Sequence, residues 1–353
     1  MSKQTKIVAT VSDKRCDVEF VRDLFENGMN VVRMNSAHLD AEGFNKIITN
    51  VRAVSNTIAI LMDTKGPEMR TTAIADDGRI HTTFQNMVTA TGRLSSTDPN
   101  LQNIPIRTEL GSEIRRMFVP SDGCVFVDAD YSQIELRVLA HIADDKTMQE
   151  AFRSGFDIHT ATAAQVFGVE PEQVTPLMRR HAKAVNFGIV YGISEFSLSE
   201  DIGVTRKEAR QYIDNYLAHY AGVRTYMHEI VEQAKRDGYV TTLFGRRREL
   251  SELKSSNFNI RSFGERVALN TPIQGTAADI IKLAMIRVDA ALRKQKLKAR
   301  LVLQVHDELI VECPIKEAEQ VKKIVTAEME NVVRLNVPLL AEAKSGASWY
   351  EAK

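Results

Sequence analysis

A strand–helix alternation fills the first part of the chain and stops near residue 70, and this change constrains the fold more than any other feature. Short apolar segments at residues 6–11, 30–34 and 57–62 alternate with helical apolar spacing at 16–27 and 41–54. Gly28 directly follows the first of these helical segments, where a helix-ending glycine is expected. Apolar strands separated by helices predict a parallel βαβαβ unit.

The organisation differs after about residue 70. A strand is expected at 125–127 with a helix from Ser132, followed by helical patterns to about residue 235 that include 178–191 and 206–218. Two hairpin strands are expected at 300–305 and 309–312, and a helix at 315–333. A length of 353 residues suggests two domains. We therefore expect an α/β part followed by an α+β part.

Composition excludes several classes of protein. The 46 basic and 46 acidic residues cancel, which argues against nucleic-acid binding by bulk positive charge but leaves local basic patches open. The three cysteines form no CxxC pair, so we expect a reduced, cytoplasmic chain without disulfides or a zinc knuckle. No apolar run approaches the roughly 20 residues of a membrane span, and no signal peptide is expected.

Three carboxylates occupy positions suited to a metal site. Asp130 ends a predicted strand, and Asp307 and Glu308 are expected in the hairpin turn. Strand ends and tight turns hold side chains rigidly, and Mg²⁺ prefers one or two carboxylates together with substrate phosphates. The alternative for Asp307 and Glu308 is ordinary turn chemistry.

A second pattern lies on the helix expected at 178–191. Arg179 and Lys183, followed by Phe187 and Tyr191, recur every fourth residue and form one stripe. Two cations followed by two aromatic rings suit a nucleoside triphosphate. The alternative is a solvated basic end and a buried aromatic end.

Several long motifs resemble the family A DNA polymerases of the bacterial DNA polymerase I type. They run in the family's order from about Gly78 to Lys353. The motifs are 89–96 (TATGRLSS), 98–105 (DPNLQNIP), 130–137 (DYSQIELR), 179–192 (RRHAKAVNFGIVYG), 272–279 (PIQGTAAD) and 304–308 (QVHDE). The resemblance implies DNA synthesis from dNTPs on a primer–template.

The resemblance also implies a two-metal active site. Asp130 and Asp307 would bridge two Mg²⁺ ions, the Tyr131 carbonyl would be a further ligand, and Glu308 would support them. The primer 3′-hydroxyl would then attack the α-phosphate of the dNTP and release pyrophosphate.

Roles at the incoming nucleotide follow from the same resemblance. Arg179, Lys183 and His159 would contact the triphosphate, and Lys183 would also donate a proton to the leaving group. Phe187, Tyr191 and Gln133 would contact the nucleotide. Glu135 would exclude the 2′-hydroxyl of a ribonucleotide.

Donor side chains are implied along the primer–template minor groove. They are Arg93, Arg266, Asn270 and Gln274, with His306 close to the primer end. All base pairs present N3 or O2 acceptors there, so donors can check pair shape without reading sequence. The alternative for Asn270 and Gln274 is helix capping or a core hydrogen bond.

Residues 3–73 resemble instead the beginning of pyruvate kinase, through 5–11 (TKIVATV), 28–35 (GMNVVRMN) and 61–70 (LMDTKGPEMR). In that family Arg33 and Arg70 would face a phosphoryl group, and Asn35, Asp63 and Thr64 would help to bind a monovalent cation. The match departs at 12–15 (SDKR) and at Ala37, and three strands are fewer than the eight of a complete barrel.

The expected chain is therefore a hybrid. Residues 1–74 would form a partial barrel. Residues 75–353 would form a polymerase palm (75–140 and 271–353) and fingers (141–270), without a thumb or exonuclease domain. The main expectation is weakened DNA synthesis. The alternatives are an inert hybrid that binds nucleotide or DNA and, more remotely, a pyruvate-kinase-like phosphotransferase.

Overall fold

The structure is a computed structural model that describes residues 6–35, 39–63, 77–104 and 109–353. The chain divides into two compact units, Met1–Arg70 and Thr71–Lys353, each with its own hydrophobic core. The predicted join between about residues 70 and 78 falls mostly outside the described residues. No helix among those described is both long and apolar enough to cross a bilayer.

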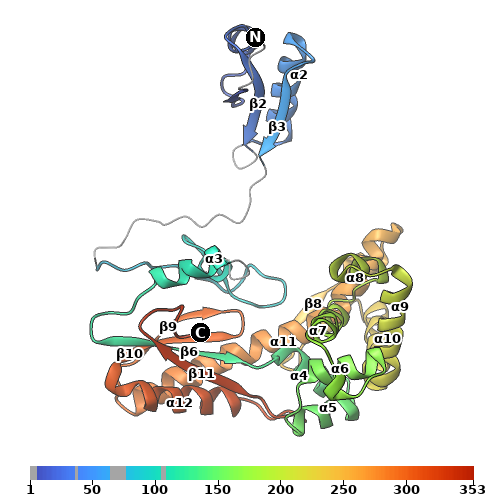
Figure 1. The fold of residues 1–353 in the computed structure, drawn as a ribbon, viewed down its shortest axis with the longest axis vertical. Helices are drawn as coiled ribbons and strands as arrows, with labels where there is room; N and C mark the ends of the chain where they lie inside the picture. Colours follow the sequence, from blue (N-terminus) through green and yellow to red (C-terminus); the bar gives the residue numbers. More distant parts are fainter. Residues whose placement is uncertain (1–5, 36–38, 64–76, 105–108) are drawn as a thin grey trace. The chain divides into compact units, whose positions relative to one another are not determined.

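The first unit is the predicted parallel βαβαβ arrangement (Figure 1). Its strands β1 (Ile7–Thr10), β2 (Met29–Asn35) and β3 (Ala59–Asp63) pair in that order. Helices α1 (Val18–Glu26) and α2 (Ala41–Val54) connect them. Gly28 has φ +94°, a conformation that favours glycine and lets the chain turn from α1 into β2.

The core of this unit lies between the sheet and its two helices. Val21, Val32, Ile47 and Val51 are completely buried in it. Apolar side chains of the outer strands are more open, and Val8 on β1 is 52% exposed. The outer strand β1 is therefore only partly covered within the described part of this unit.

The second unit is built on a four-stranded antiparallel sheet with the order β11-β6-β10-β9. The strands are β6 (Cys124–Tyr131), β9 (Arg300–Val305), β10 (Glu308–Pro314) and β11 (Ala341–Gly346). The central strand β6 has Glu308 of β10 opposite Asp130. Glu308 was expected in the hairpin turn. It is instead the first residue of β10, because its backbone pairs across the sheet.

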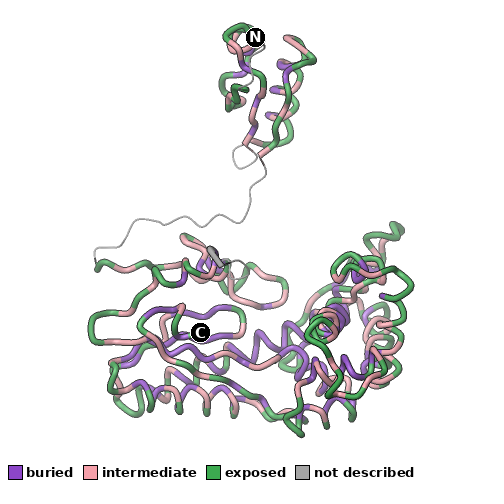
Figure 2. Tube along the Cα trace, viewed as in Figure 1, coloured by how far each residue is buried: buried purple, intermediate pink, exposed green. Residues whose placement is uncertain are grey.

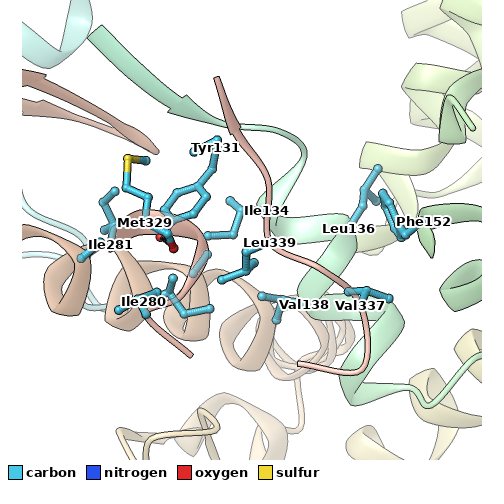
Figure 3. Close-up of a cluster of buried hydrophobic side chains, with 14 of the residues drawn as sticks. Tyr131, Ile134, Leu136, Val138, Phe152, Ile280, Ile281, Met329, Val337 and Leu339 are labelled. Atoms are coloured by element: carbon cyan, nitrogen blue, oxygen red, sulfur yellow. Dashed lines mark hydrogen bonds between the residues drawn. The ribbon is translucent and has the colours of Figure 1, made fainter. Parts of the chain in front are cut away.

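Two helices, α11 (Phe258–Lys294) and α12 (Ala318–Glu330), pack with this sheet. Buried residues are concentrated along the inner strands and α11 of this unit (Figure 2). Figure 3 shows Tyr131 from β6 beside Met329 of α12 and Ile281 of α11. The Tyr131 hydroxyl donates a hydrogen bond to the Met329 carbonyl at 2.6 Å. This packing fixes the strand that carries Asp130.

The remaining part of the second unit is mainly helical (Figure 1). Its helices are α4 (Ile134–Ile142), α5 (Lys146–Arg153), α6 (Ile158–Phe167), α7 (Pro176–Val190), α8 (Glu195–Ile202), α9 (Arg206–His219) and α10 (Ala221–Asp237). Smaller elements are β4 (Thr83–Gln85), β5 (Ser95–Thr97), α3 (Glu109–Glu113), β7 (Tyr239–Thr241) and β8 (Arg247–Glu249). The expected palm–fingers boundary at 270/271 lies inside the continuous helix α11.

Candidate active site

Two of the predicted metal ligands meet at the end of β6. Asp130 is the next-to-last residue of that strand, and Asp307 lies in the turn between β9 and β10. The backbone N–H of Tyr131 donates a hydrogen bond to the carbonyl of Asp307 at 3.2 Å. The sheet therefore brings together residues that are 177 positions apart in the sequence.

Electrostatics support a cation at this position. Burial, followed by repulsion from Asp130, raises the pKa of Asp307 to about 7. Asp130 Oδ1 is buried and has no hydrogen-bond partner within the described residues. A bound cation would offset both effects, because it attracts the carboxylates and satisfies the unpaired oxygen.

The side chains at this position would supply only part of the ligands of a metal ion. In the described ranges, no three or more His, Cys, Asp or Glu side chains surround one cation position. Two carboxylates and a backbone carbonyl are consistent with Mg²⁺, which usually completes its shell with water and substrate phosphates. The residues thus fit a metal that is shared with a substrate.

Glu308 is held by two cations that we did not identify from the sequence. It is 3% exposed, and its carboxylate pairs with Lys353 and lies 3.5 Å from Arg115 Nη1. The guanidinium of Arg115 lies over the Trp349 ring, and Lys353 Nζ is 3.5 Å from Asp130 Oδ2. No local sequence signal marks either cation, since both contacts join distant segments.

Asp128 is a further carboxylate that the sequence analysis missed. It is 4% exposed, and neither carboxylate oxygen has a hydrogen-bond partner in the described part of the chain. Burial raises its pKa to about 6. A sequence signal existed, because residues two apart on a strand share a face and Asp128 precedes Asp130 by two.

Helix α7 presents the predicted stripe away from the core. Its N-cap is Thr175, whose hydroxyl accepts from the N–H of Met178, and the helix begins at Pro176 rather than at residue 178. The apolar face is fully buried at Ala182 and Val185, whereas Tyr191 is 43% exposed. The alternative of a buried aromatic end therefore does not hold.

The basic end of the stripe meets α6. Arg179 makes two hydrogen bonds to Asp157, at 2.7 and 3.1 Å. Burial by itself raises the pKa of Asp157, but the bonds from Arg179 and Thr160 outweigh it and leave the pKa at about 2. His159 follows on α6 and is 3% exposed, with its ring 5.8 Å from that of Phe187. Asp157 was missed, although its place beside His159 was a usable signal.

Glu135 links the stripe to the carboxylates. Its side chain, 7% exposed on α4, forms an ion pair with Arg93 and accepts a hydrogen bond from the Tyr191 hydroxyl at 3.3 Å. Gln274 donates to the same hydroxyl at 3.1 Å. Burial raises the pKa of Glu135, although Arg93 and Tyr191 oppose that rise. The negative charge of Glu135 also contributes to the raised pKa of Asp307.

An open groove of about 570 Å³ continues from the aromatic end of the stripe. Phe187, Tyr191 and Arg266 line it, together with residues of the α7–α8 connection. The structure therefore brings two predicted nucleotide-binding residues together with one predicted DNA-binding residue.

Three further predicted residues lie near these elements. Gln133 precedes α4 with φ +53°, and His306 is exposed in the β9–β10 turn with φ +53°. Asn270 lies on α11, where its Oδ1 is buried without a partner among the residues described. The structure does not test the roles predicted for these side chains.

Comparison with known proteins identifies the family of this chain. The family model for DNA polymerase family A matches residues 33–351. The chain belongs to DNA polymerase family A. The family resemblance found from the sequence motifs is thereby confirmed, whereas the pyruvate kinase resemblance of residues 3–73 stays a prediction.

Family A relatives match most of this chain with high identity. DNA polymerase I of Bacillus subtilis (strain 168) is 60% identical over 280 residues, which cover 79% of this chain and 32% of that protein. DNA polymerase I of Bacillus caldotenax is 52% identical over 312 residues, or 88% of this chain and 36% of that protein. The chain thus spans about a third of the length of these relatives.

A solved family A structure also matches the fold. It is the POL domain of Pol1 from M. smegmatis in complex with DNA primer-template and dNTP. It is 41% identical with a TM-score of 0.77, covering 95% of this chain and 56% of that one.

Proposed function

We propose that this chain catalyses template-directed DNA synthesis by transferring a nucleotide from a dNTP to a primer 3′-hydroxyl. The observation that carries the proposal is the connection of two predicted sites through Glu135. Tyr191 at the end of the stripe donates to Glu135, and Glu135 lies within electrostatic reach of Asp307. A triphosphate on the stripe would therefore place its reacting end toward the carboxylates.

The carboxylates are the proposed metal ligands. Family membership implies a general dependence on divalent metal, and we assign two Mg²⁺ ions to Asp130, Asp307 and the Tyr131 carbonyl. When bound, the metal would supply charge stabilisation for the attacking and leaving oxygens. Glu308, neutralised by Lys353 and Arg115, holds this end of the sheet in place.

The residues of α6 and α7 bind the triphosphate in this proposal. Arg179 exchanges Asp157 for phosphate oxygens, and Lys183, exposed one turn later, neutralises charge and donates a proton to the leaving group. His159 contributes a further donor. Phe187 and Tyr191 pack against the nucleotide, beside Gln133.

Selectivity and primer–template binding are assigned to the surrounding side chains. Glu135 occupies the space that a ribose 2′-hydroxyl would need. Donors to the minor groove are Arg93, Arg266, Asn270 and Gln274, with His306 near the primer end. We expect weak, distributive synthesis with short extension products.

A primer-extension assay tests the proposal. The wild type should extend a labelled primer with dNTPs and Mg²⁺ or Mn²⁺, whereas Asp130→Ala and Asp307→Ala should lower the rate by at least about 10³-fold. Asp289→Ala is a matched control, since Asp289 makes an i,i+4 pair with Arg293 on α11. Equal extension by the wild type and both active-site variants would refute the catalytic assignment. Primer–template binding without extension in either metal would support the inert hybrid instead.

The first unit admits a separate proposal. We infer that it is a three-stranded piece of a pyruvate-kinase-like barrel. Arg33 on β2 forms an ion pair with Asp63 at the corresponding end of β3 and donates to Thr10 Oγ1 at 3.1 Å. Arg70 and Thr64 lie outside the described residues. Phosphoenolpyruvate-dependent ATP formation, abolished by Arg33→Ala, would be needed to assign phosphotransfer to this unit.

A further inference from the structure

Four buried polar side chains form a hydrogen-bonded network between α6, α7 and the α9–α10 connection. They are His159 and Thr162 on α6, Asn186 on α7 and Tyr220 between α9 and α10, with exposed fractions of 3%, 0%, 0% and 1%. Polar groups buried this deeply destabilise a fold unless they are hydrogen-bonded. The pattern of bonds among them therefore determines which atoms carry protons.

Asn186 is the central residue of this hydrogen-bonded network. Its side-chain nitrogen Nδ2 lies 3.2 Å from His159 Nδ1 and donates to Thr162 Oγ1 at 3.0 Å. Thr162 Oγ1 also lies 3.3 Å from Asn186 Oδ1 and 3.2 Å from the Tyr220 hydroxyl. Both protons of the amide group are thus used, one toward each residue of α6.

With Asn186 Nδ2 facing His159 Nδ1, this arrangement favours one tautomer of His159. An amide nitrogen donates and does not accept, so Nδ1 of the imidazole must accept the bond. A neutral ring that accepts at Nδ1 carries its proton at Nε2. Burial lowers the pKa of His159 to about 4, Asp157 opposes this, and Arg179 and Lys183 reinforce it, so the ring is neutral near pH 7. In the part of the chain that the structure describes, Nε2 has no hydrogen-bond partner.

We propose that Asn186 is a positioning residue for nucleotide binding, which fixes His159 as the Nε2–H tautomer so that the ring donates to a phosphate oxygen. The other tautomer would present a lone pair at Nε2 and repel that oxygen. This inference rests on the proposed function, because it assumes a triphosphate bound beside Arg179 and Lys183. The tautomer itself can be measured without any nucleotide.

Nuclear magnetic resonance of the full chain with ¹⁵N-labelled histidine measures the tautomer directly. Two-bond ¹H–¹⁵N correlations distinguish the tautomers, and His159→Gln identifies the signal. The wild type should show the Nε2–H form. Asn186→Asp replaces the donor by an acceptor of nearly equal size and should move the proton to Nδ1 or leave the ring doubly protonated. An Nδ1–H ring in the wild type, or an unchanged spectrum in Asn186→Asp, would overturn the proposal.

Two variants separate positioning from general stability. Thr162→Val removes a hydroxyl from the same buried network but keeps the hydrogen bond from Asn186 to His159. The tautomer should therefore stay unchanged. Asn215→Ala on α9 removes another amide hydrogen bond, from Asn215 Nδ2 to the Val166 carbonyl at 2.9 Å, and should also leave the spectrum unchanged. A tautomer change in either variant would show that loss of packing, rather than Asn186, controls the ring.

Kinetics test the consequence for the nucleotide. Asn186→Ala and His159→Ala should each raise the KM for dNTP by up to about 10-fold, the size of one hydrogen bond, and the double variant should be no worse than either. Additive effects would contradict action through His159. If the wild type binds no dNTP at all, the nucleotide role fails together with the proposed function, and the spectrum still decides the tautomer.

Discussion

At the scale of single residues, Glu135 connects more of the predicted site residues than its neighbours on α4 do. It is almost fully buried, yet it contacts a predicted minor-groove donor, Arg93, and a predicted nucleotide contact, Tyr191. A buried carboxylate needs such partners, since an unpaired charge in the interior is strongly unfavourable. The same contacts hold the Glu135 side chain in one position, where we propose that it faces the sugar of the nucleotide.

Shortening Glu135 should weaken discrimination against ribonucleotides. In Glu135→Ala, the ratio of ribonucleotide to deoxyribonucleotide kcat/KM should rise by about 10- to 100-fold, because the space for a 2′-hydroxyl opens. Single-nucleotide primer extension with matched rNTP and dNTP measures it. Glu319→Ala, which changes an exposed carboxylate on α12, should leave the ratio unchanged. An unaltered ratio in Glu135→Ala would contradict its role as the gate.

Glu312 is a second buried carboxylate that is held by hydrogen bonds. It is 3% exposed on β10 and accepts hydrogen bonds from Arg79 and from the N–H of Ser121. Burial alone raises the pKa of Glu312, but the bonds from Arg79 and Ser121 outweigh it, and the pKa falls below its ordinary value of 4.5. The ionised carboxylate therefore stabilises the fold above about pH 4.5, and this contribution is lost as the pH falls further.

Replacing Glu312 should change the acid dependence of stability. Glu312→Gln should lower the free energy of unfolding at pH 7 by about 1–3 kcal/mol, because charged hydrogen bonds become neutral ones. The difference from the wild type should shrink as the pH is lowered below 4.5. Urea unfolding of the full chain at pH 7 and at lower pH measures both values. A difference independent of pH would contradict this assignment.

At the scale of elements, the side chain of Asp145 connects helices α5 and α10. Its Oδ1 accepts from the N–H of Met148 at 2.9 Å and caps α5. Its Oδ2 accepts from the N–H groups of Gly222 and Val223, at 2.8 and 3.3 Å, at the start of α10. The N-cap residue of α10, Tyr220, makes no side-chain capping bond of its own. One carboxylate thus satisfies both helix N-termini.

Removing this shared cap should cost more than removing an ordinary one. Asp145→Ala should destabilise the second unit by about 2–4 kcal/mol, twice the usual effect of one N-cap. Thr205→Ala, which removes the exposed cap of α9, is the matched control and should cost about 1 kcal/mol. Urea unfolding gives both values. Equal losses would show that Asp145 acts at only one helix.

The elements themselves were largely predictable. Helix α2 has the bounds expected from its apolar spacing, and β9 begins and ends where the hairpin pattern placed it. Errors occurred at ends, where capping decides: Thr175 and Pro176 start α7 earlier than its apolar stripe does. The hairpin turn was placed one residue too long, because pairing of Glu308 with Asp130 depends on a distant strand.

At the scale of the whole molecule, the chain has two units with separate cores. Val32 is fully buried in the first core, and Val138 is fully buried in the second. The contacts described above for the candidate active site join residues of the second unit. We therefore expect the two units to lose their structure independently.

A charge buried in either core tests this independence. Val32→Asp should unfold the first unit, since an unpaired buried carboxylate costs more than about 4 kcal/mol, while primer extension stays within about 2-fold of the wild type. Val138→Asp should unfold the second unit and abolish extension. Limited proteolysis with mass spectrometry shows which unit has opened. Loss of extension in Val32→Asp would show that the site depends on the first unit.

The sequence by itself determined the family, the strand–helix order and the residue types of the site. Long motifs and apolar periodicity are local, so they can be read without knowing what packs against them. Only the tertiary structure decided which charges meet. Arg115 and Lys353 pair with Glu308, Asp157 pairs with Arg179, and the side-chain nitrogen of Asn186 lies against Nδ1 of His159. These contacts depend on how sheet strands pair and how helices pack, and no spacing along the chain encodes the distances between such groups.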